Sequence, residues 1–112
     1  MVDNWKIEYD QRQFRLMHDQ LILFEKGKLD LASLIKGIKG LLSVLEEVDE
    51  SWIDKIRREW GILETVYAVA VQRKEQNLAQ DTQTTINDPV YRSLINEATQ
   101  NMRQLVQDVL RT

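Results

Sequence analysis

The chain has no cysteine, one proline and four glycines among its 112 residues. Without cysteine it cannot form a disulfide, a thiolate zinc site, an iron–sulfur cluster or a thiol nucleophile. Helix-breaking residues are also too scarce for a turn-rich all-β fold. The first residues lack the pattern of a secretory signal, and no apolar run approaches the length of a membrane span. We therefore expect a single all-α domain over residues 1–112, located in the cytoplasm and not in a membrane.

Basic residues are outnumbered by acidic ones, with 15 Lys and Arg against 18 Asp and Glu, and the formal net charge is -3. Such an average surface repels phosphate backbones, so we expect no nucleic-acid partner. The basic residues Lys55, Arg57 and Arg58 lie close together, but Asp54 and Glu59 flank them. This alternation is typical of a mixed-charge helix face.

Groups that could carry catalysis are also few. His18 is the one histidine, and no Glu-x-x-His pair accompanies it, so a metal would need a carboxylate-rich shell. No serine lies in a Gly-x-Ser-x-Gly elbow, and no set of residues supplies a nucleophile, a base and an orienting group. We expect no enzyme activity, no cofactor and no metal site, and we interpret His18 as an ordinary surface imidazole.

Four segments repeat apolar residues at spacings of three and four, which predicts four amphipathic helices. The first stripe runs through Phe14, Met17, Leu21 and Phe24, after a short Trp5–Tyr9 approach segment. We expect helices near residues 11–26, 30–47, 51–76 and 89–110, with a polar loop over 77–88.

The predicted ends carry local signals. Gly27 suits a helix C-terminus and Asp30 suits an N-cap. Ser51 with Asp54 resembles a capping box in which Asp replaces Glu. Asp88–Pro89 is a strong start signal, because Pro in the first turn loses no intrahelical hydrogen bond.

Amphipathic helices with mostly short links favour an antiparallel four-helix bundle. The polar segment before Pro89 would also permit a swapped or intertwined dimer, in which the last helix packs on another subunit. Gly37 and Gly40 lie inside the second predicted helix. We interpret them as a place of close approach by a neighbouring helix, in preference to a hinge or a partner groove.

Three aromatic residues of the third predicted helix, Trp52, Trp60 and Tyr67, share helical spacing, and we assign them to the core rather than to a partner-binding surface. Trp5 precedes the first regular helix and is expected to be exposed or docked across a seam between helices. Glu64 stands among apolar residues. We expect its carboxylate to be partly buried and held by an ion pair.

The least ordinary charge feature is a run of carboxylates without any Lys or Arg between them, named here the acidic cluster: Glu46, Glu47, Asp49, Glu50 and Asp54. Carboxylates near a helix N-terminus are favoured by the helix dipole, so capping alone explains part of the run. The same negative field could also steer a basic protein to this end of the fold. These five residues are our candidates for partner binding.

The second and third predicted helices also carry a family resemblance. The pattern consists of Leu34-Ile35 through Leu41-Leu42, then Leu45-Glu46-Glu47-Val48, then Trp52, Ile56, Trp60, Leu63-Glu64 and Tyr67-Ala68. It resembles small bacterial proteins of unknown function, and is similar to immunity proteins of bacterial toxin systems. The resemblance covers roughly residues 20–71.

That resemblance implies a non-catalytic protein that binds a cognate toxin stoichiometrically and blocks its active site or its access to substrate. Nuclease toxins are commonly basic, which would give the acidic cluster a use. The alternative is a structural or adaptor protein that self-associates or recruits a cytoplasmic partner. Raised salt should slow binding by a toxin inhibitor, whereas self-association through an apolar patch should depend weakly on salt.

Overall fold

The computed structural model describes residues 4–111 and shows an all-helical chain, with no strand in that range. The all-α prediction is confirmed. Within the described range the helices are α1 (Asn4–Glu25), α2 (Leu31–Ser43), α3 (Glu50–Glu75), the short α4 (Thr82–Ile86) and α5 (Pro89–Val109). None of these helices is both long enough and apolar enough to cross a bilayer.

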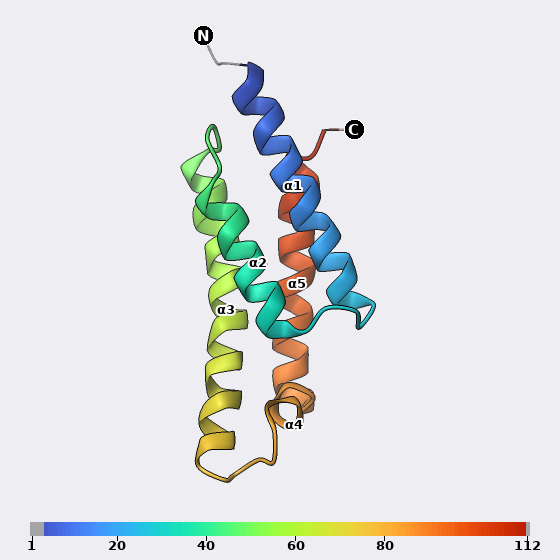
Figure 1. Ribbon diagram of the computed structural model, residues 1–112, viewed down its shortest axis with the longest axis vertical. Helices are drawn as coiled ribbons and strands as arrows, with labels where there is room; N and C mark the ends of the chain where they lie inside the picture. Colours follow the sequence, from blue (N-terminus) through green and yellow to red (C-terminus); the bar gives the residue numbers. More distant parts are fainter. Residues whose placement is uncertain (1–3, 112) are drawn as a thin grey trace.

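The four long helices pack in a closed circuit, in which α1 contacts α2, α2 contacts α3, α3 contacts α5, and α5 returns to α1 (Figure 1). Their apolar stripes meet in a core that includes Met17, Leu21, Ile56, Leu63 and Met102, all fully buried. The α1–α2 pair is shifted along the long axis relative to the α3–α5 pair. The resulting molecule measures 56 × 23 × 18 Å.

Helix α1 begins at Asn4, so the predicted start near residue 11 is wrong. No Pro or Gly interrupts the Trp5–Tyr9 segment, and the buried stripe continues one turn earlier than expected, to Asp10. The predicted end is confirmed: Gly27 has a φ of +73°, and the amides of Gly27 and Lys28 donate to the carbonyls of Phe24 and Leu23. This is the Schellman arrangement, which requires the left-handed conformation that glycine adopts without strain.

Helix α2 starts as predicted, with the Asp30 carboxylate accepting a hydrogen bond of 2.7 Å from the Ser33 amide. It ends at Ser43, so the predicted extension to residue 47 is wrong. In a continuing helix the amides of Glu46 and Glu47 would bond to carbonyls four residues earlier. Instead both amides donate to the side chain of Asp10 on α1. They are therefore not available for the helical hydrogen bonds that would continue α2.

Helix α3 begins with Asp49 as its N-cap, and the Ser51 amide and hydroxyl both donate to the Asp49 carboxylate. The predicted capping box of Ser51 with Asp54 is therefore wrong. Asp49, which stands two residues before Ser51, is the cap, and its carboxylate already accepts the first-turn amide. At the other end Asn77 adopts a φ of 57°, and a second Schellman arrangement closes the helix.

The predicted polar loop over 77–88 contains helix α4, so that part of the prediction is wrong. Asp81 caps α4, and Thr85 and Ile86 are buried against the neighbouring helices. Within α4, Ile86 is the one apolar residue, which gives no periodicity to detect, although its burial anchors this single turn. The restart at Asp88–Pro89 is confirmed, with Asp88 as N-cap and Pro in the first turn of α5.

The two glycines of α2 differ in their surroundings. A Cβ built on Gly37 would overlap the side chain of Gln20 on α1, which agrees with close approach of a neighbouring helix. A Cβ on Gly40 would meet nothing within 4 Å, so close approach is the wrong interpretation there.

Candidate functional site

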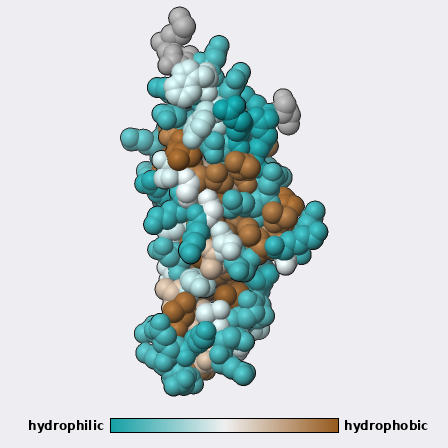
Figure 2. Space-filling model, in the orientation of Figure 1, coloured by the Kyte–Doolittle hydropathy of each residue, from teal (hydrophilic) through white to brown (hydrophobic). Residues whose placement is uncertain are grey.

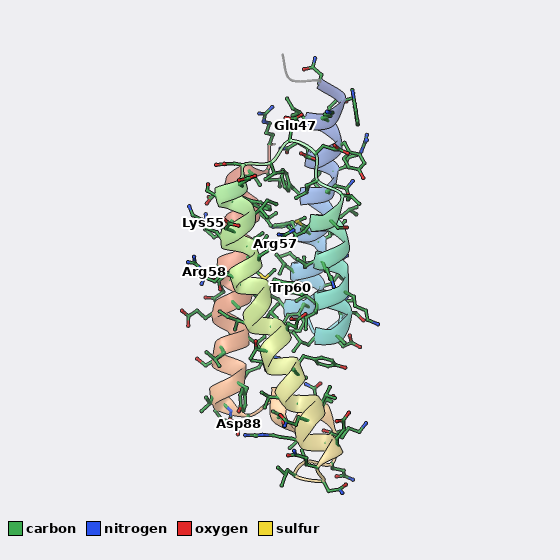
Figure 3. All side chains as sticks on the ribbon, turned by 90° about the vertical axis from the view of Figure 1, so that its left-hand side faces the viewer. Glu47, Lys55, Arg57, Arg58, Trp60 and Asp88 are labelled. Atoms are coloured by element: carbon green, nitrogen blue, oxygen red, sulfur yellow. The ribbon has the colours of Figure 1, made fainter. Side chains whose placement is uncertain are left out.

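The acidic cluster lies where α2 passes into α3, at the upper end of the molecule in Figure 3, where Glu47 is labelled. Glu46 and Glu47 belong to the connection, Asp49 caps α3, and Glu50 and Asp54 follow in its first turns. The side chains of all five residues are exposed. The structure therefore brings the predicted residues together on one exposed segment.

Asp10, a residue that the sequence analysis missed, fixes the shape of this segment. It is only 3% exposed, and its two carboxylate oxygens accept hydrogen bonds from the backbone amides of Glu46, at 2.9 Å, and Glu47, at 2.7 Å. Successive amides that converge on one anion make a strong, directional site. The carboxylates of Glu46 and Glu47 are thus carried on a backbone that α1 holds in place.

The end of α5 is tied to the same part of α1. The Gln11 amide nitrogen donates to the Val109 carbonyl at 2.8 Å, and its oxygen accepts from the Arg111 amide at 2.7 Å. The Trp52 indole N–H donates to the Leu105 carbonyl at 2.8 Å, and its ring meets Phe14 edge-on. Side chains from α1 and α3 therefore connect three helices behind the acidic cluster.

These contacts surround a hollow of about 330 Å³ at the upper end. Four carboxylates line it, those of Asp10, Glu47, Asp49 and Asp108, together with the cationic side chain of Arg111. Asp108 thus extends the negative surface beyond the predicted cluster. Because it stands sixty residues away in the chain, only the packing of α5 against α1 brings it here.

The charges of the acidic cluster are mostly free to act on a partner. Among residues 4–111, Glu47 is the only member of the cluster in an ion pair, at 3.6 Å from the Lys6 ammonium. Hydrogen bonds from the Ser51 hydroxyl and amide lower the pKa of Asp49 below its ordinary 3.8, so this carboxylate keeps its charge into mildly acidic solution. Asp49 therefore presents a fixed negative charge at the start of α3.

The prediction for the aromatic residues is only partly correct. Trp52 is buried, whereas Trp60 and Tyr67 are half-buried at the edge of the core. Trp5 is exposed, as expected. The prediction for Glu64 is wrong, because its side chain is exposed and makes no ion pair within the described residues. Its position on α3 points it away from the buried stripe on which Leu63 and Val66 lie.

The basic residues of α3 do not form one patch. Lys55 and Arg58 border a hollow beside α5, while Arg57 lies on the opposite side, toward α2 (Figure 3). This separation follows from the helical repeat, which places neighbouring residues about 100° apart.

Comparison of the chain with protein-family models, curated proteins and solved structures finds no match.

Proposed function

We propose that this chain is a non-catalytic protein-binding module, built as an antiparallel four-helix bundle, whose acidic cluster binds a basic surface of a partner protein. In its most specific form the proposal is an immunity protein that neutralises a cognate bacterial toxin in the cytoplasm by stoichiometric binding. The observation that carries it is the exposed carboxylates on a connection whose backbone is held by the buried Asp10.

Preorganisation supports this use of the cluster. A flexible acidic loop would lose conformational entropy on binding, whereas a connection already fixed by hydrogen bonds loses little. The Glu46 and Glu47 side chains are exposed on that fixed backbone. Complementary charge at such a site raises the association rate and selects against acidic partners.

The test is an affinity pull-down from the native cytoplasm with the wild-type chain and a cluster variant carrying Glu46→Gln, Glu47→Gln, Asp49→Asn and Glu50→Gln. Asn also caps helices well, so α3 should keep its start. The matched control neutralises four exposed carboxylates elsewhere: Asp19→Asn, Glu64→Gln, Glu75→Gln and Glu97→Gln. Both variants lose four negative charges, so they differ only in where the charge is removed.

We expect one basic partner to be recovered by the wild type and by the control but not by the cluster variant, with an association rate that falls as salt is raised. Retention of the partner by the cluster variant would overturn the proposal. Equal loss in both variants would show that net charge, not this site, controls the interaction.

Self-association is a second candidate, favoured by the outward face of α1. Trp5, Leu16 and Leu23 are 58%, 48% and 40% exposed, and their spacings of eleven and seven place them on one helix face. Figure 2 shows hydrophobic side chains gathered over α1 and α2 across the middle of the molecule. Light scattering of the wild type and of a Leu16→Glu/Leu23→Glu variant tests this candidate. A dimer that becomes monomeric in the variant supports it, and a wild-type monomer excludes it.

A further inference from the structure

A second hollow, of about 320 Å³, lies between α2 and α3 and is separate from the one at the acidic cluster. We call it the α2–α3 groove. Its lining residues come from both helices: Lys39, Leu42, Ser43, Arg57, Trp60 and Gly61. In Figure 3, Arg57 and Trp60 lie on the side of α3 that adjoins α2.

The groove is open because Gly61 has no side chain, and the fold itself does not require glycine there. Gly61 lies inside α3, has no positive φ, and a Cβ added to it would meet nothing within 4 Å. Glycine in a helix interior is less favourable than alanine. A residue that weakens the helix without a packing reason, and that leaves an apolar hollow open, points to a role in binding.

The groove combines an apolar floor with two available cations. The Trp60 indole N–H already donates to the Ile35 carbonyl at 2.9 Å, which fixes the ring against α2. The Ser43 hydroxyl donates to the Gly40 carbonyl at 2.7 Å, so it is also satisfied. Lys39 and Arg57 are exposed, and neither makes an ion pair anywhere in residues 4–111.

Helix α2 strengthens this positive character, because Leu31–Ser43 contains Lys36 and Lys39 and no carboxylate. A ligand for the groove therefore needs an apolar body and a negative group. Arg57 offers a planar fork of donors that suits a carboxylate, and Lys39 adds a second positive charge on a flexible stem.

We propose that the α2–α3 groove binds a small carboxylate with one aromatic ring system, the ring lying against Trp60 and Gly61 and the carboxylate between Lys39 and Arg57. The volume is at the lower end of the range for ligand pockets, which limits the occupant to a small molecule. This site is independent of the protein-binding function proposed for the acidic cluster, because the two hollows share no lining residue.

The probe is naphthylacetate, with the uncharged naphthylacetamide as its matched analogue. Binding is followed by amide NMR titration, in which the Trp60 indole N–H signal reports directly on the groove. We expect naphthylacetate to bind with a dissociation constant of about 1 mM or below, a modest affinity for a ligand of this size. The amide should bind at least about threefold more weakly, because it lacks the charge that the two cations recognise.

Two variants test the location. Gly61→Leu fills the groove and is compatible with α3, since no atom obstructs its Cβ, and it should weaken binding more than about tenfold. The double variant Lys39→Gln/Arg57→Gln should reduce naphthylacetate to the affinity of the amide. Gly40→Ala, a change on the same helix pair but outside the lining, should leave binding unaltered.

Far-ultraviolet circular dichroism verifies that each variant is folded. If Gly61→Leu does not fold, the double variant still decides the matter, because both of its changes are at exposed positions. Absence of shifts at the Trp60 indole, equal affinity for acid and amide, or unchanged binding by a folded Gly61→Leu variant would each overturn the proposal.

Discussion

Replacing Asp10 with alanine should destabilise the protein far more than replacing Asp19, the other aspartate of α1. The Asp10 carboxylate is 3% exposed and accepts two backbone amides. A hydrogen bond to a charged group contributes about 1.5–3 kcal/mol. Because Glu46 and Glu47 are themselves exposed, water can reach the freed amides and replace part of this energy. We therefore expect Asp10→Ala to lower the free energy of unfolding by about 2–4 kcal/mol.

Urea unfolding followed by circular dichroism measures this change, provided that the dependence on urea is the same in both proteins. Asp10→Asn keeps one acceptor but turns an NH₂ group toward the second amide, so it should lose roughly half as much. Asp19→Ala is the control, because Asp19 is exposed and makes no side-chain hydrogen bond or ion pair in the described chain. It should change the unfolding free energy by less than about 0.5 kcal/mol.

Amide hydrogen exchange supplies a local measure. The Glu46 and Glu47 amides should be protected in the wild type and exchange much faster in Asp10→Ala. The assigned role of this carboxylate is refuted if the free energy of unfolding of Asp10→Ala lies within about 0.5 kcal/mol of the wild-type value and the two amides keep their protection.

Three further outcomes are expected. Gly40→Ala should raise the free energy of unfolding, measured in urea, by about 0.5–1 kcal/mol. Gly37→Ala should raise it by less, because the added Cβ requires the Gln20 side chain to move. Trp52→Phe should destabilise the protein by about 1 kcal/mol, since the Leu105 carbonyl loses its indole donor. An unchanged midpoint of urea unfolding would contradict this. The capping aspartates Asp30, Asp49 and Asp81 have a pKa below the ordinary 3.8, chiefly through hydrogen bonds from Ser33, Ser51 and Thr84. Their stabilisation is complete above that unfolded value and is lost as pH falls through the lower folded values, so a triple Asn variant should lose less stability in acid than the wild type.

The helices could be predicted where the cause is local. Asp30, Gly27 and Asp88–Pro89 act on amides or carbonyls a few residues away, and each ends or starts its helix as the sequence indicates. The end of α2 could not be predicted in this way. It depends on Asp10, thirty-six residues from Glu46, and such a contact leaves no mark in the periodicity of α2 itself.

The candidate site likewise combines features that are local in the sequence with contacts between distant residues. Its exposed carboxylates are visible in the sequence because all five fall within residues 46–54 with no Lys or Arg between them. Asp10 gave a weaker signal: it stands one turn before Phe14 on the buried stripe of α1, where a charged residue requires a partner. That spacing could have identified Asp10 as buried, but not which amides it would meet. The α2–α3 groove had no signal beyond Gly61, since a lone glycine does not reveal whether its space is filled.

The offset of the two helix pairs bears on how the molecule opens. Helix α3 is about 39 Å long at 1.5 Å per residue, and its last turns extend past α1 and α2 (Figure 1). There they are covered mainly by α5 and the single turn of α4, with Leu78 left 71% exposed. With fewer apolar neighbours, this end should separate in brief excursions while the upper helices stay paired. Hydrogen exchange should thus report a low free energy of opening near residues 72–88 and a high one in the core around Met17 and Ile56. A protease should cut first within residues 72–88.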